Sequence, residues 1–250
     1  MPAESILSVR RLSKRFGGLQ ALASVDFDVF EGDIFGVIGP NGAGKTTLFS
    51  CLVGSLAPTS GEIRFRGERI DRLPNHAVVK RGVVRTHQIV RPFREMSVRE
   101  NVAVAAHFGA GRRRGADAER RVTDILQWTG LASEADAPAG TLTIGQLKRL
   151  EIARALATEP RVICLDEVLG GLNPAEIVAA ISLIRSIGHS GVTVLLIEHH
   201  VHAVVGLSNR ILVLNFGEKI AEGPPQAILR DPVVISAYLG DAKEDQSCSP

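Results

Sequence analysis

The segment FGVIGPNGAGKTT, residues 35–47, has the residue types and the spacing of a phosphate-binding loop. Its glycines allow backbone N–H groups to curl around phosphate oxygens, and a helix start adds partial positive charge. We expect Lys45 to reach the β- and γ-phosphates of a nucleotide and the Thr46 hydroxyl to hold Mg²⁺. The predicted nucleotide contacts in this loop are Gly39, Pro40, Asn41, Gly42, Ala43, Gly44, Lys45, Thr46 and Thr47. A chance glycine-rich turn is disfavoured because an apolar run precedes the loop and a helical run follows it.

The segment RVICLDE, residues 161–167, is a second candidate, because an apolar strand there ends in two acids. Asp166 is suited to hold Mg²⁺, directly or through water, and Glu167 is suited to orient or deprotonate an attacking water molecule. Taken alone, the segment would be better interpreted as a strand end with two solvated acids. The phosphate-binding loop in the same chain favours the metal and catalytic roles.

Two further segments predict helix starts. In TLTIGQLKRLEIARALA, residues 141–157, Thr143 and Gln146 have the spacing of a capping box. Gly145 in the first turn costs helix stability, so we expect another surface to approach its backbone closely. Asn173, Pro174 and Glu176 predict another helix start, with a capping side chain, a proline at the first position and an acid at the third.

These segments need a framework, and the sequence predicts one of mixed α/β type. Short β-rich stretches with partial alternation indicate an antiparallel sheet near the N-terminus, at residues 6–10, 25–30 and 62–66. Continuously apolar runs indicate strands of a parallel sheet buried on both faces, at residues 34–38, 162–165 and 192–197. Residues 96–152 are expected to be mainly helical, with helices at 98–107, at 118–129 and after Gln146.

Composition narrows the classes of protein. The 250 residues carry a formal net charge of +2, which is too near neutral to indicate nucleic-acid binding. No apolar run approaches the roughly 20 residues that a membrane helix needs, and no signal peptide is predicted. Three widely spaced cysteines lack metal-ligand spacing and suggest a reducing compartment, with Cys164 as a core residue. The run Arg112–Arg114 is either an anionic contact or a solvated loop, and the latter is favoured since no aromatic residues interleave the charges.

The phosphate-binding loop, LTIGQ and CLDE follow one another in an order that resembles the ATP-binding subunits of ABC transporters, over residues 7–240. The resemblance implies an α/β fold of the P-loop NTPase class (ABC ATPase). Such a fold has a RecA-like core, an N-terminal antiparallel β subdomain and an α-helical signature subdomain. We therefore expect one ABC ATPase domain at residues 5–240, with the helical subdomain inserted at about 96–157. Residues 241–250 are polar and are expected to form a disordered tail.

The resemblance also assigns roles to single residues. Phe16 matches the aromatic residue that stacks on adenine, although a core phenylalanine at a strand end is the alternative. Gln88 matches a glutamine that touches Mg²⁺ or water and links to the membrane subunits. His199 matches a histidine that contacts the γ-phosphate, although a lone histidine is more often structural.

The LTIGQ segment matches the signature that, in this family, faces ATP held by the other subunit of a head-to-tail dimer. Thr143, Gly145 and Gln146 would then contact that nucleotide. The implied catalytic residues are Glu167, His199 and Gln88, and the implied metal ligands are Thr46, Gln88 and Asp166.

The Arg-Thr-x-Gln loop and the ending AYLG resemble the branched-chain amino-acid uptake ATPases. The sequence departs from the family pattern at His87, Thr143, Ile144, Val168, Leu169 and His200. Thr143 keeps the hydroxyl of the usual serine, and none of these departures removes a group with a predicted catalytic role.

The resemblance implies an ATP- and Mg²⁺-dependent hydrolase that powers an importer from the cytoplasmic face of a bacterial-type membrane, as a peripheral subunit. Its implied partners are integral membrane permease subunits, a second ABC ATPase subunit and, indirectly, an extracytoplasmic solute-binding protein, with no nucleic acid. The transported solute is not specified by the sequence. The alternatives are an ATPase for urea or amide uptake, one for lipopolysaccharide export, and a soluble iron–sulfur-assembly ATPase.

Overall fold

The computed structural model describes residues 5–86, 91–109 and 115–244, and the chain forms two compact units. The first unit comprises residues 1–73 and 195–250, and the second comprises residues 74–194. The division between their ranges falls within strand β8, Thr193–Ile197, all of whose residues are buried. The architecture is the mixed α/β type that the sequence predicts.

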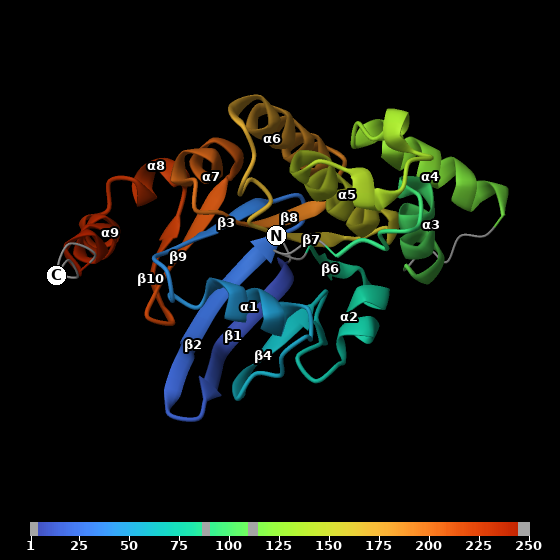
Figure 1. Cartoon of the computed structure of the whole chain (residues 1–250). Helices are drawn as coiled ribbons and strands as arrows, with labels where there is room; N and C mark the ends of the chain where they lie inside the picture. The colour runs from blue at the N-terminus through green and yellow to red at the C-terminus, as the bar shows by residue number, and fades with distance from the viewer. Residues whose placement is uncertain (1–4, 87–90, 110–114, 245–250) are drawn as a thin grey trace. The chain divides into compact units, whose positions relative to one another are not determined.

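The first unit contains the predicted antiparallel sheet, whose strands follow the order β2-β1-β4-β5 (Figure 1). Its members are β1 (Ser5–Phe16), β2 (Leu19–Phe30), β4 (Ser60–Phe65) and β5 (Glu68–Arg69). Strands β1 and β2 are both 12 residues long and extend well beyond the predicted ranges 6–10 and 25–30. The register of β1 against β2 shifts between positions Val9 and Leu12 and again between Leu12 and Lys14. Such bulges interrupt the alternation of apolar and polar residues, which explains why the predicted strands are too short.

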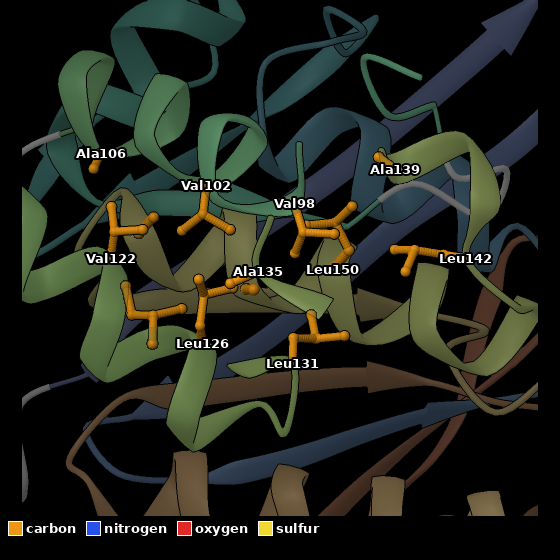
Figure 2. Close-up of a cluster of buried hydrophobic side chains, with 13 residues drawn as sticks. Val98, Val102, Ala106, Val122, Leu126, Leu131, Ala135, Ala139, Leu142 and Leu150 are labelled. Atoms are coloured by element: carbon orange, nitrogen blue, oxygen red, sulfur yellow. The ribbon is translucent and has the colours of Figure 1, made fainter. Parts of the chain in front are cut away.

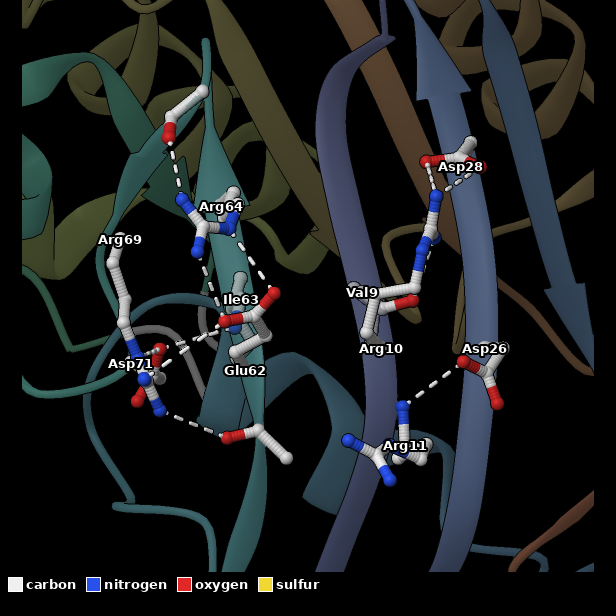
Figure 3. A network of polar contacts seen from close by, with 12 residues as sticks. Val9, Arg10, Arg11, Asp26, Asp28, Glu62, Ile63, Arg64, Arg69 and Asp71 are labelled. Atoms are coloured by element: carbon white, nitrogen blue, oxygen red, sulfur yellow. Dashed lines mark hydrogen bonds and ion pairs between the residues drawn. The ribbon is translucent and has the colours of Figure 1, made fainter.

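Polar contacts line the outer face of this sheet (Figure 3). Arg10 makes a bidentate contact with Asp28 at 2.9 and 2.8 Å. Arg64 donates two hydrogen bonds to Glu62, and these bonds lower the pKa of the Glu62 carboxyl. Exposed pairs of this kind contribute little stability each, so the sheet depends mainly on its apolar face.

The first unit also contains parallel strands. Strand β3 (Ile34–Ile38) pairs in parallel with β9 (Arg210–Asn215), which forms an antiparallel hairpin with β10 (Glu218–Gly223). The rings of Phe27 and Phe35 stack with centroids 5.6 Å apart and join the faces of β2 and β3. The helices of this unit are α1 (Lys45–Leu52), α7 (Val201–Leu207), α8 (Pro225–Ile228) and α9 (Pro232–Glu244).

Helix α9 differs from the sequence-based expectation, because it continues to Glu244 and so includes the first four residues of the stretch predicted as a disordered tail. The remainder of that stretch, residues 245–250, lies outside the described residues. Strands β9 and β10 were not among the predicted elements.

The second unit contains the helical region that the sequence predicts. Its helices α3 (Val98–Phe108), α4 (Ala116–Trp128) and α5 (Ile144–Ala157) lie together and enclose a cluster of buried apolar side chains (Figure 2). Leu150, Ala153 and Ala157 of α5 all belong to this cluster. Two short 3₁₀ turns, η1 (Ala132–Glu134) and η2 (Ala139–Thr141), connect α4 to α5.

The remaining elements of the second unit are α2 (Asn75–Arg81), β6 (Val83–Arg85), β7 (Val162–Asp166) and α6 (Pro174–His189). Strands β6 and β7 pair in parallel, and all five residues of β7 are buried, as its continuous apolar run predicts.

Two cysteines lie in the core of the described residues. Burial raises the pKa of the Cys51 thiol to about 11 and that of Cys164 to about 12, which makes both thiols unreactive near neutral pH. The core position of Cys164 is as predicted, whereas Cys248 lies outside the described residues. No helix among the described residues is long and apolar enough to span a membrane.

Candidate functional site

The predicted phosphate-binding loop lies between β3 and α1, which confirms the strand–loop–helix context. Gly39 has φ +153°, and a Cβ on it would lie 2.1 Å from the carbonyl oxygen of Leu214. Gly44 has φ +99°, and a Cβ on it would lie 2.5 Å from the carbonyl oxygen of Ala21. Both distances are too short for a side chain, so neighbouring backbone forces glycine at the two ends of this loop.

Lys45 closes the loop. Its Nζ donates to the carbonyl oxygens of Gly39, at 2.7 Å, and Pro40, at 2.8 Å, and the residue is only 6% exposed. Helix α1 begins here without a side-chain cap and without an acidic residue in its first turn. A buried ammonium beside a helix N-terminus whose first turn has no acidic residue favours an anion, as phosphate binding requires.

Phe16 is the last residue of β1, beside the turn at Gly17 and Gly18, and it is 47% exposed. The Lys14 ammonium lies over its ring, 5.2 Å from the centroid. The ring is therefore not the strand-end core residue that the sequence left as an alternative. Its stacking on adenine remains a prediction.

His199 is exposed and lies two residues after the end of β8. The next residue, His200, is the N-cap of α7 and makes no side-chain capping hydrogen bond. The contact of His199 with a γ-phosphate remains a prediction.

Asp166 ends β7 and is fully buried. Its Oδ2 forms an ion pair with Arg85, and its backbone N–H donates to the Thr86 hydroxyl at 3.1 Å. Its Oδ1 has no hydrogen-bond partner among the described residues. A buried carboxylate oxygen without a donor suits a hard cation such as Mg²⁺, so this residue fits its predicted role.

Glu167 follows β7, is partly buried, and adopts φ +50°, in the left-handed region that non-glycine residues rarely occupy. Its carbonyl oxygen accepts from Lys148 Nζ at 2.7 Å and from the N–H of Gly170 at 3.3 Å. A non-glycine residue in this conformation is often found at a functional site and fits the predicted role of a catalytic carboxylate.

The LTIGQ segment starts α5 as predicted, with a complete capping box. The N–H of Gln146 donates to Thr143 Oγ1 at 3.3 Å, and the N–H of Thr143 donates to Gln146 Oε1 at 2.9 Å. Gln146 Nε2 also donates to Glu134 Oε1 at 3.0 Å. Thr143 and Ile144 are exposed, so this helix start presents a hydroxyl and an apolar side chain at the surface.

The close approach expected at Gly145 is present within the chain itself. A Cβ on Gly145 would lie 2.3 Å from Oε1 of Glu176, the third residue of α6. Glu176 is fixed there because its Oε2 accepts from the N–H of Asn173 at 3.0 Å, in a capping box at the helix start that the sequence predicts. Glu176 thus accounts for the glycine. Contacts of Thr143, Gly145 and Gln146 with a nucleotide on a second subunit remain predictions.

Three predicted features cannot be placed. Gln88 and the neighbouring His87 lie outside the described residues, as does the run Arg112–Arg114. The sequence did not predict that Arg85, Lys148 and Glu176 contact residues of the candidate site. Their partners lie 81, 19 and 31 positions away along the chain, so only the folded structure could identify them.

The sequence is similar to known families and proteins. The sequence model of the family described as "ABC transporter" matches residues 22–170, and that described as "Branched-chain amino acid ATP-binding cassette transporter" matches residues 218–244. The high-affinity branched-chain amino acid transport ATP-binding protein BraF of Pseudomonas aeruginosa is 46% identical over 253 residues, covering 95% of this chain and 98% of that protein. The corresponding protein LivG of Escherichia coli is 42% identical over 254 residues, covering 96% and 100%.

A solved structure supports the same fold. The ADP conformation of MJ1267, an ATP-binding cassette of an ABC transporter, superimposes with a TM-score of 0.86 at 30% identity, covering 95% of this chain and all of that chain.

Proposed function

Because the chain belongs to the ABC transporter ATPase family, we propose that it is the ATP-hydrolysing subunit of an importer for branched-chain amino acids. The observation that carries the substrate class is the match of residues 218–244 to the branched-chain cassette family, in addition to the match of the ATPase region. The names of BraF and LivG, which cover nearly the whole chain, support the same class.

In this proposal, the loop between β3 and α1 binds the phosphates of ATP. The Lys45 ammonium and the first-turn N–H groups of α1 contact the β- and γ-phosphates, and the exposed ring of Phe16 stacks on adenine. This assignment is supported by the two hydrogen bonds that Lys45 Nζ donates to the carbonyl oxygens of Gly39 and Pro40, which hold the ammonium within the loop.

For hydrolysis, Glu167 accepts a proton from the water that attacks the γ-phosphate, and His199 contacts that phosphate as negative charge shifts to the leaving oxygen. Thr46, Asp166 and Gln88 are the residues that would hold Mg²⁺, which neutralises phosphate charge when it is bound. The unpartnered Oδ1 of Asp166 is the feature of the described residues that supports this ligand set.

We further propose that the chain works as one of two ABC ATPase subunits, with Thr143, Gly145 and Gln146 facing the nucleotide of the partner. Permease subunits would receive the motion near Gln88, and an extracytoplasmic solute-binding protein would deliver the amino acid. This arrangement places the chain at the cytoplasmic face of the membrane as a peripheral subunit.

The test is uptake of labelled leucine and urea by source cells that lack other leucine transporters and whose only copy of this chain carries Glu167→Gln. We expect leucine uptake to be lost and urea uptake to be unchanged. Glu218→Gln, which removes an exposed carboxylate on β10, is the matched control and should leave both unchanged. Loss of urea uptake alone would overturn the substrate class, and normal uptake of both solutes would overturn the proposed function.

A further inference from the structure

Helix α5 is connected to the segment that follows β7 through one side chain. Lys148 lies two residues after Gln146 on α5, and its Nζ donates to the carbonyl oxygen of Glu167 at 2.7 Å. An ammonium group makes a stronger hydrogen bond to a carbonyl than a neutral donor does. The start of the LTIGQ helix and the backbone of Glu167 are therefore joined within one unit of the chain.

The bonded carbonyl belongs to a residue in an uncommon conformation. Glu167 has φ +50°, which a non-glycine residue keeps only where its surroundings favour it. The carbonyl accepts from Lys148 and from the N–H of Gly170, and the two residues after Glu167, Val168 and Leu169, are buried. Contacts at the carbonyl of Glu167 and at the residues that follow it thus hold its backbone, and the backbone sets where the carboxylate can reach.

The surroundings of Lys148 explain why a long cationic side chain fits here. Lys148 borders a cavity of about 270 Å³ between α5 and α6, which is also lined by Arg149, Ile152, Val168 and Glu176. A guanidinium group in place of the ammonium would keep a cationic donor, and a methionine would keep the apolar stem without a donor.

We propose that Lys148 is a positioning residue for ATP hydrolysis, which orients Glu167 by holding its carbonyl oxygen and thereby joins the signature helix to the catalytic carboxylate. The inference rests on the proposed role of Glu167. Lys148 itself touches neither nucleotide nor water in this account, so its loss affects turnover more than ATP binding.

The test compares steady-state ATP hydrolysis by the purified full-length chain and by Lys148→Met, Lys148→Gln and Lys148→Arg. We expect Lys148→Met and Lys148→Gln to lower kcat about tenfold or more, with KM for ATP changed by less than about twofold, since a misplaced catalytic group costs rate and not binding. Lys148→Arg, which retains a cationic donor, should recover part of the lost kcat.

Arg149→Met is the matched control. It removes a neighbouring cation on the same helix, which borders the same cavity and donates to the carbonyl of Gly130 at 3.0 Å, and we expect it to keep kcat near wild type. The midpoint of thermal unfolding for each variant separates misfolding from an effect on turnover.

Glu167→Gln, measured in parallel, distinguishes the two claims. If Glu167→Gln abolishes hydrolysis while folded Lys148→Met or Lys148→Gln keeps wild-type kcat, the positioning role is wrong and the proposed function stands. An equal loss of kcat in Arg149→Met would also overturn the positioning role. If Glu167→Gln hydrolyses ATP at the wild-type rate, the proposed role of Glu167 fails, and that of Lys148 fails with it.

Discussion

At the residue scale, each of three glycines in the candidate site has a neighbouring atom too close for a Cβ. Gly39 and Gly44 face backbone carbonyl oxygens, which cannot move without displacing a strand. Gly145 faces the Glu176 carboxylate, the end of a side chain that could move only by leaving its cap on α6. Glycine therefore lets the phosphate-binding loop curl at Gly39 and Gly44, and it lets the starts of α5 and α6 lie close together at Gly145.

The contact at Gly145 predicts a coupling between two substitutions. In an otherwise wild-type chain, Gly145→Ala displaces Glu176, so a loss of about 1 kcal/mol from the α6 cap opposes a gain of about 1 kcal/mol in helix propensity. In a Glu176→Ala background only the gain remains. Urea unfolding of the four proteins should therefore give a change on Gly145→Ala that is more favourable by about 1 kcal/mol when Glu176 is absent. Equal changes in the two backgrounds would contradict the close approach.

At the element scale, helices α3, α5 and α6 all begin with complete capping boxes, and a buried asparagine secures the chain before α3. Asn101 is fully buried, and its Oδ1 accepts from the N–H of Phe93 at 2.9 Å. Its Nδ2 donates to the carbonyl oxygens of Phe93, at 3.0 Å, and Ser97, at 2.9 Å. One fully buried side-chain amide thus joins the backbone at Phe93 to the first residues of α3.

Removing this amide should destabilise the helical region. We expect Asn101→Ala to lower the free energy of unfolding by about 2 kcal/mol or more, because the hydrogen bonds of a fully buried side-chain amide to Phe93 and Ser97 are lost. Gln127→Ala, an exposed truncation on α4, should change it by less than about 0.5 kcal/mol. Chemical denaturation followed by circular dichroism measures both, and similar values for the two variants would show that Asn101 has no such role.

Features that depend only on residues close together in the sequence could be predicted. Examples are the loop at Gly39–Lys45 and the helix caps at Thr143 and Asn173. The signals of these elements lie within a few positions of one another. The full length of β1 and β2 was missed because bulges break the alternation. The contacts of Asp166 with Arg85, and of Glu167 with Lys148, depend on tertiary packing that leaves no local pattern.

At the scale of the whole molecule, the proposed function makes the rate of ATP hydrolysis by this chain respond to other proteins. The similarity to BraF extends over 95% of the chain and therefore includes both the ATPase region and the C-terminal segment after β9. As a transporter subunit, the chain should hydrolyse ATP at a rate that responds to the solute that its complex carries.

The most direct measurement is ATP hydrolysis by the complete complex, in which this chain is assembled with its partner ATPase, permease subunits and solute-binding protein in lipid vesicles. We expect leucine-loaded binding protein to stimulate hydrolysis, unloaded binding protein to stimulate it less, and Glu167→Gln to remove the stimulated activity. Hydrolysis that is indifferent to the binding protein and to leucine would contradict the claim that this ATPase powers uptake of branched-chain amino acids.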